Sequence, residues 1–156
     1  RDKTAQSTEG RREKRAGRAM AQRIRGLPQK GTSLKMKTRE SNEQASLMVW
    51  AAYQAGRFPE LDLLYHIPNG GSRNSIEAYH LKEQGVKAGV PDLCLPVARG
   101  AFHGLYIELK IKGNKPTTKQ RDWIERLREQ GYKAEVCYGW EEASGVLLDY
   151  LTLKKA

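Results

Sequence analysis

The spacing of apolar residues along the chain changes several times between the period of an amphipathic helix and that of a strand. The elements that this pattern predicts are, in order, a helix over 41–56, a strand over 61–67, a helix over 74–84, strands over 92–97 and 104–111, a helix over 117–130, a strand over 132–138 and a helix over 140–153. This order predicts an α/β fold in which helices cover both faces of a mixed four-stranded sheet.

Capping signals mark two of the expected helix starts. Ser41 with Gln44, and Thr117 with Gln120, have the spacing of a capping box, in which two side chains satisfy backbone N–H groups reciprocally. The strand, helix and strand between residues 106 and 138 are expected to form a right-handed parallel crossover.

Length and composition place the chain among soluble single-domain proteins. Its 156 residues suit one domain with its own core, and no apolar run is long enough to span a membrane. No signal-peptide pattern is present, so we expect a cytoplasmic protein without a membrane partner. Cys94 and Cys137 each lie inside an apolar run, which favours buried free thiols over a disulfide or a zinc site.

Positive charge is concentrated near the start of the sequence. Residues 1–39 contain 13 Lys and Arg against three acids, a net charge of +10, whereas residues 40–156 contain 15 of each sign. The basic segment has no aromatic residue, so it cannot bury enough surface to fold alone. We interpret it as a flexible arm that binds nucleic acid, and the alternative is a solvated linker. The arginines expected to contact phosphates are Arg11, Arg12, Arg15, Arg18, Arg23 and Arg25.

Candidate chemistry lies in the two central strands. Asp92 follows Pro91 at the start of the first, and Glu108 and Lys110 point to the same face of the second. If these strands pair, Asp92 reaches Glu108 across the sheet, while Glu108 and Lys110 look outward and Leu109 faces the core. Two carboxylates beside an ammonium group can hold a hard divalent cation and a water molecule. The alternative is that Asp92 is a turn residue and Lys110 a solvated lysine.

Five segments of the chain are informative as an ordered set. They read NEQASLMVW, HIPNGGSR, GVKAGVPDLCLPV, GLYIELK and TTKQRDWIERLREQGYKAEVCYGWEEA. In this order they resemble the VRR-NUC family of the PD-(D/E)xK nuclease superfamily, in the short, stand-alone form of phages and bacteria. The resemblance extends over about residues 40–153. It implies a restriction-endonuclease-like αβββαβ core within a nuclease domain of residues 40–156.

The resemblance implies a role for each member of the central group. Asp92, Glu108 and the backbone carbonyl of Leu109 would hold Mg²⁺, for which Mn²⁺ can substitute. Lys110 would position the attacking water or help to deprotonate it, and would stabilise charge in the transition state.

Two further side chains have both a functional and a structural interpretation. Glu43 matches a glutamate on the family's first helix that reaches the metal directly or through water, although the helix dipole alone favours a glutamate in a first turn. Glu40 is the neighbouring candidate if the register differs. Gln120 matches a glutamine that could orient the water or Lys110, and it equally completes the capping box with Thr117.

Loops around the central group supply candidate contacts to nucleic acid. The candidate residues are Asn69, Gly70, Gly71, Arg73, Lys87, Gly89, Lys112 and Lys115. The first four resemble the family's substrate loop, but Asn-Gly-Gly is also a tight-turn signal. Lys87 and Gly89 could let a DNA backbone approach closely, whereas the alternative for Lys87 is a solvated lysine beside a flexible loop.

These features favour a Mg²⁺-dependent endodeoxyribonuclease that hydrolyses phosphodiester bonds in flapped, nicked or branched DNA during repair or recombination. Stand-alone members of the family look dimeric, so a homodimer in the cytoplasm of a bacterium or a phage-infected host is expected. The competing interpretation is a non-catalytic nucleic-acid-binding module on a nuclease-like scaffold. The presence of Glu43, Asp92, Glu108 and Lys110 together argues against that alternative.

Overall fold

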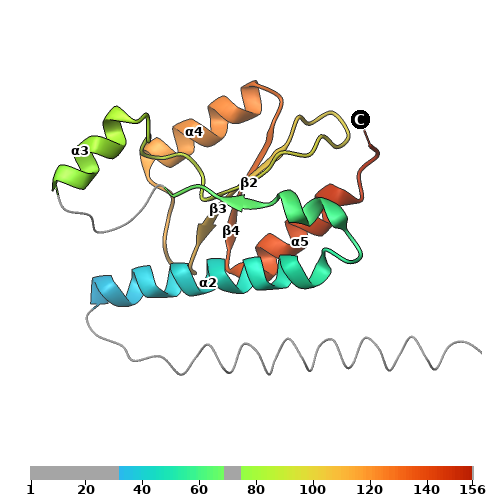
Figure 1. The fold of residues 1–156 in the computed structure, drawn as a ribbon, viewed down its shortest axis with the longest axis horizontal. Coiled ribbons are helices and arrows are strands. Elements are labelled where there is room, and N and C mark those ends of the chain that lie inside the picture. The colour runs from blue at the N-terminus through green and yellow to red at the C-terminus, as the bar shows by residue number, and fades with distance from the viewer. Residues whose placement is uncertain (1–31, 69–74, 156) are drawn as a thin grey trace, which may run out of the picture. The chain divides into compact units, whose positions relative to one another are not determined.

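The structure is a computed structural model that describes the backbone over 32–68 and 75–155, and side chains over 39–68 and 79–155. Its elements are α2 (Thr32–Gln54), the 3₁₀ helix η1 (Pro59–Leu63), β1 (Tyr65–His66), α3 (Ser75–Glu83), β2 (Leu93–Leu95), β3 (Leu105–Lys110), α4 (Thr118–Glu129), β4 (Lys133–Tyr138) and α5 (Trp140–Leu151), as drawn in Figure 1. No helix in this described part is long and apolar enough to cross a membrane.

The strands form one mixed sheet in the order β1-β2-β3-β4. β2 is antiparallel to both of its neighbours, whereas β3 and β4 are parallel and are joined by α4. Leu93 of β2 lies opposite Ile107 of β3. In an antiparallel pair this register also places Asp92 opposite Glu108. The predicted mixed four-stranded sheet is therefore confirmed, and so is the parallel pairing across α4.

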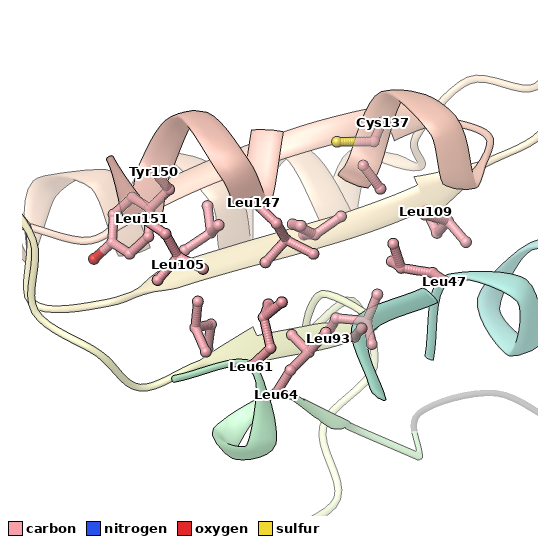
Figure 2. Packing of buried hydrophobic residues seen from close by; sticks show 14 residues of the cluster. Leu47, Leu61, Leu64, Leu93, Leu105, Leu109, Cys137, Leu147, Tyr150 and Leu151 are labelled. Atoms are coloured by element: carbon pink, nitrogen blue, oxygen red, sulfur yellow. The ribbon is translucent and has the colours of Figure 1, made fainter. Parts of the chain in front are cut away.

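The main hydrophobic core lies on the face of the sheet that α2 and α5 cover. Figure 2 shows Leu47 of α2 and Leu147 of α5 converging on Leu93, Leu105 and Leu109 of the central strands. All five side chains are buried. Each fully buried leucine contributes about 1.5–3 kcal/mol to folding, so this side of the sheet fixes the positions of β2 and β3.

Helix α4 covers the opposite face of β3 and β4 (Figure 1). It begins at the capping box predicted from Thr117 and Gln120, in which each side chain bonds the backbone N–H of the other. Ile124 is the buried residue of this helix. Among the even-numbered side chains of β3, Glu108 and Lys110 are buried, and Tyr106 is half-buried.

Helix α2 begins at Thr32, so the prediction of a helix start at Ser41 was wrong. The segment from 32 to 40 contains no glycine or proline, and several of its residues are good helix formers. Helical geometry can therefore extend through it, and Ser41 lies inside the helix. The local capping signal was present but was not used.

The apolar run over 61–67 was predicted to be one strand, and this was also wrong. Pro59 opens the 3₁₀ helix η1, which ends at Leu63, and β1 contains only Tyr65 and His66. A 3₁₀ helix repeats every three residues. That period buries both Leu61 and Leu64, and it leaves Leu63 exposed, whereas strand alternation would not place residues three apart on one side.

The remaining elements agree with the sequence analysis to within a few residues. Helix α3 is followed by Gly85, which has a φ of +91°, the conformation expected of a glycine that ends a helix. Cys94 and Cys137 are buried free thiols, as predicted.

Candidate active site

Asp92 directly precedes β2 and is fixed from both of its neighbouring strands. Its Oδ2 accepts the backbone N–H of Leu109 on β3 at 2.9 Å. Its backbone carbonyl lies 2.8 Å from Nδ1 of His66 in β1 and accepts the N–H of Ile67, the next residue, at 2.8 Å. Pro91, which is buried, precedes it. Asp92 is thus held where three strands meet. This fixed position does not agree with the alternative that Asp92 is only a turn residue.

Glu108 and Lys110 form a buried ion pair on the even-numbered face of β3. Glu108 is 0% exposed and Lys110 is 8% exposed, so the expectation that they look outward was wrong. Nζ of Lys110 lies 2.5 Å from Oε1 of Glu108 and 3.2 Å from the carbonyl oxygen of Leu109. The two side chains do share one face as predicted, but α4 covers that face.

Gln120 connects α4 to this pair. Its Oε1 accepts the backbone N–H of Thr117 at 2.8 Å, and its Nε2 donates to Oε1 of Glu108. The capping and site contacts, which the sequence left as alternatives, are therefore made together. Oε1 of Glu108 receives both Gln120 and Lys110, while Oε2 of Glu108 is buried and has no hydrogen-bond partner among the described residues.

The pKa values of the two carboxyl groups reflect this crowding. Burial, followed by the neighbouring negative charge of Asp92, raises the pKa of Glu108 to about 7, against the opposing effect of Lys110. Burial also raises the pKa of Asp92, despite the hydrogen bond from Leu109. Burial alone would lower the pKa of Lys110, but the hydrogen bond and charge of Glu108 outweigh it and raise that pKa. The ammonium group therefore stays charged, while burial favours the neutral forms of the two carboxyl groups.

The two glutamates of α2 that the sequence singled out lie in different surroundings. Oε2 of Glu43 accepts the backbone N–H of Trp140 at 3.0 Å, so this side chain caps the start of α5. Oε1 of Glu40 accepts Nδ2 of Asn114 at 3.1 Å, beside the turn that follows β3. Of these two glutamates, Glu40 is the one whose negative charge raises the pKa of Asp92, Glu108 and Lys110.

The loop before Asp92 packs against α4. Gly89 has a φ of +95°, and a Cβ at this position would lie 2.8 Å from the backbone of Lys119. The close approach at this glycine is thus made by α4 of the same chain. Lys87 is exposed on the same loop, and Lys112 and Lys115 are exposed on the turn after β3.

Several predicted contacts lie outside the described residues. They are Asn69, Gly70, Gly71, Arg73 and the six arginines between Arg11 and Arg25. The sequence analysis also missed Asn114, which lies in the turn after β3 and bonds Glu40 of α2. No local signal could have paired residues this far apart in the chain, because only the folded packing of α2 against that turn brings them together.

A mixed four-stranded sheet that carries two carboxylates, a lysine and a glutamine in this arrangement is what the resemblance to the PD-(D/E)xK nuclease superfamily implies. The family model described as the VRR-NUC domain matches residues 28–141, and the chain belongs to this family.

Two relatives support this assignment. A solved structure titled "VRR_NUC domain protein" is 37% identical, with a TM-score of 0.64, and the match covers 74% of this chain and 90% of that one. A Fanconi-associated nuclease 1 homolog from Caenorhabditis briggsae is 29% identical over 115 residues. That match covers 72% of this chain but only 12% of the relative, so the chain spans about one eighth of its length.

Proposed function

We propose that this chain is a divalent-metal-dependent endonuclease that hydrolyses phosphodiester bonds in DNA, with a preference for flapped, nicked or branched structures. Its family is a nuclease family, and the buried group around Glu108 is the observation that carries the rest of the proposal. Two carboxyl groups face each other across β2 and β3, and burial raises the pKa of each despite the nearby charge of Lys110. A bound cation would stabilise the charged forms of both groups.

The residues present fit Mg²⁺ or Mn²⁺. Oε2 of Glu108 is buried without a hydrogen-bond partner among the described residues, which costs free energy unless a ligand meets it. Asp92 and the carbonyl of Leu109 supply further oxygen atoms beside it. Within the described part of the chain, no group of three or more His, Cys, Asp or Glu side chains is placed to hold an ion. Magnesium suits such a site, because it takes one or two carboxylates and keeps several waters.

The chemistry then divides between the cation and the chain. The bound ion would activate a water molecule and neutralise charge on the phosphate. Lys110, whose pKa is raised, stays protonated, so it orients the water and stabilises the developing negative charge and does not act as the base. Gln120 fixes the rotamer of Glu108 from α4, because its other end is held by the capping box at Thr117.

We assign the supporting carboxylate of α2 to Glu40 and not to Glu43. Glu43 is engaged with the start of α5, whereas Glu40 interacts electrostatically with Asp92, Glu108 and Lys110. Since no three-carboxylate group is formed among the described side chains, Glu40 acts on the charge of the site and not as a direct ligand.

The basic segment 1–39 would supply long-range attraction to DNA, mainly through residues 1–31, which precede α2. Residues 1–31 contain 10 Lys and Arg against three acids, whereas residues 40–156 have no net charge. Each phosphate neutralised on duplex DNA adds about −0.9 to the salt slope of binding. Removing 1–31 should therefore flatten this slope by roughly four units if about half of its basic residues contact phosphates. An unchanged slope would show that the segment is a linker.

We also propose that the protein acts as a homodimer, since two-fold symmetry suits an enzyme that cuts two strands. Sedimentation equilibrium of the full chain tests this proposal. A monomer at all concentrations, with cleavage retained, would contradict it.

Cleavage of a panel of labelled DNAs tests the proposed function. Flap, nicked-duplex, splayed-arm and four-way-junction substrates of shared sequence should be cut in Mg²⁺ and left intact in excess EDTA. Asp92→Asn and Glu108→Gln should abolish cleavage while retaining DNA binding, because they remove ligands and no basic residue. Asp62→Asn is the matched control, since Asp62 is an exposed acid in η1.

Two results would reject the proposal. Robust cleavage in EDTA would exclude a metal-dependent reaction. Normal turnover by Asp92→Asn would exclude the group around Asp92 and Glu108 as the active site. Tight DNA binding without cleavage of any substrate in any divalent metal would instead favour a non-catalytic binding module.

A further inference from the structure

The surface beside the carboxylates contains a shallow groove of about 330 Å³. Its lining is mainly apolar and comes from the end of β1, the loop after α3 and the exposed side of α4. The side chains that shape it are Ile67, Pro68, Val86, Lys87, Val90 and Trp123. Among the eight described residues that line it, the only charged side chain is Lys87 and there is no carboxylate.

Both walls of the groove are attached to the candidate active site. On one wall, the backbone N–H of Ile67 donates to the carbonyl oxygen of Asp92. On the other, Gln120 lies one helical turn before Trp123 and bonds Glu108. In an α-helix, residues three apart are neighbours on one face. The groove therefore adjoins the elements that hold Asp92 and Glu108.

Trp123 differs from the other two tryptophans of the chain. Trp50 and Trp140 pack against the main core, whereas Trp123 is not among the described residues that do so. The buried residue of α4 is its neighbour Ile124. Trp123 also lines a second hollow, and the guanidinium of Arg126 lies over its ring, 5.7 Å from the ring centroid. A large aromatic ring therefore stands at the surface, with cations near it.

We propose that this groove receives one unpaired nucleobase of the DNA substrate, stacked on the indole of Trp123. This inference rests on the proposed function and deepens it. A nucleobase is planar and apolar on its faces, and its own backbone phosphate is anionic, which suits an apolar groove that carries Lys87 and lies near Arg126. Every base has a π face, so the contact would be tolerant of sequence.

The occupied groove would give the enzyme a physical reason to prefer structured DNA. A base in a flap or splayed arm is already free to enter the groove. A base in an intact duplex must first be unpaired and unstacked, which costs a few kcal/mol. The same enzyme would therefore bind an unpaired nucleotide beside the scissile phosphate more tightly than a paired one.

The test compares two DNAs and three variants of the full-length protein. One DNA is a nicked duplex, and the other carries a short flap with 2-aminopurine, whose fluorescence falls on stacking, at its first unpaired positions. Trp123→Leu keeps an apolar side chain without a ring face, whereas Trp123→Phe keeps a ring. Tyr53→Leu is the control, because Tyr53 is a 67% exposed aromatic on α2 and does not line the groove. Affinity is measured in Ca²⁺, and cleavage is measured in Mg²⁺.

Wild type and Tyr53→Leu should quench 2-aminopurine and bind the flap more tightly than the nicked duplex. Trp123→Leu should lose the quenching and about 10- to 100-fold in flap affinity, the range expected for one base-stacking contact, with little change on nicked duplex. Trp123→Phe should retain most of the quenching and most of the flap affinity. Melting temperatures of all variants establish that each one is folded.

Equal losses for Trp123→Leu and Trp123→Phe, or equal losses on both DNAs, would overturn the inference in favour of a packing role. If wild type cuts flaps and Trp123→Leu keeps the same preference and quenching, the groove proposal alone fails. If wild type neither binds nor cuts any of the DNAs, the proposed function fails with it.

Discussion

Strand β3 presents Leu105, Ile107 and Leu109 to one side of the sheet, and Tyr106, Glu108 and Lys110 to the other. The first set packs into the core shared with α2 and α5. On the second side, Glu108 and Lys110 are buried almost as completely, beneath α4. Burial therefore does not distinguish the two faces. The two faces differ in energy: burial of the apolar face stabilises the fold, whereas burial of the polar face costs free energy because charged groups leave water.

The comparison shows how a small domain can hold reactive groups rigidly. Packing of the apolar face fixes the backbone of β3, and the fixed backbone in turn positions the polar side chains of the same strand. A hydrogen bond from Gln120 to Glu108 and one from the backbone N–H of Leu109 to Asp92 then set the orientations of the two carboxylates. A site built on a central strand in this way needs little rearrangement to bind a metal.

The largest effect is expected on the apolar face. Ile107→Ala should lower the free energy of unfolding by about 2–5 kcal/mol, because the side chain is buried and its removal leaves a cavity. Denaturant unfolding followed by circular dichroism measures this change. Glu108→Gln, one residue away, is the matched substitution on the polar face. It removes no apolar volume and keeps an oxygen acceptor for Lys110, so at neutral pH it should destabilise the metal-free protein less than Ile107→Ala does. Equal destabilisation by both substitutions would remove the proposed difference between the faces.

The polar face should also make stability depend on pH. The carboxyl of Glu108 has a pKa of about 7 in the folded protein, against an ordinary value of 4.5. Between these values the folded chain keeps a proton that the unfolded chain releases, so stability falls as pH rises through this window. The slope is at most about 1.4 kcal/mol per pH unit. Asp92 acts in the same direction, since its pKa is also raised, whereas the raised pKa of Lys110 matters only above its ordinary value of 10.5.

Metal-free protein unfolded in denaturant at several pH values, from about 4.5 to about 8, tests this prediction. Wild type should lose a few kcal/mol relative to Glu108→Gln across this range. If the free energy of unfolding changed with pH in the same way for both proteins, folding would not raise the pKa of Glu108.

A smaller effect separates the two glutamates of α2. Glu40→Gln should lower turnover by about 10- to 100-fold, the range typical of groups that support a metal site without binding the metal. Glu43→Gln should change turnover little, because an amide oxygen can still accept the N–H of Trp140. Glu43→Ala should instead cost about 1 kcal/mol of stability, as the loss of a helix cap does. Steady-state cleavage and thermal unfolding of the three variants decide the assignment, and a large turnover loss confined to Glu43→Gln would reverse it.

The sequence contained enough information to place the two central strands and most of the polar group. Alternation along β3 predicted that Glu108 and Lys110 share a face, and the capping box at Thr117 located α4. Both signals are local. The burial of Glu108 was not predicted, because it depends on α4, a later element, folding back over the sheet.

The choice between Glu40 and Glu43 could not be made locally either. The two residues lie three apart on one helix and so occupy neighbouring positions on the same face. Only partners distant in the chain, Asn114 for one and Trp140 for the other, distinguish their roles. The start of α2 at Thr32 is a further case, because a capping signal at Ser41 was outcompeted by helix-forming residues before it.

Binding of Mn²⁺ measured by calorimetry tests the central claim most directly, namely that the polar face of β3 is a metal site. Wild type and Glu108→Gln are titrated near pH 7 in two buffers of different ionisation enthalpy. The account predicts that wild type binds Mn²⁺ and releases protons, because the Glu108 carboxyl, with a pKa of about 7, is only partly ionised before the metal arrives. Glu108→Gln should lose this proton release and most of the affinity. Absence of Mn²⁺ binding to wild type, or binding with the same affinity and proton release in Glu108→Gln, would contradict the account.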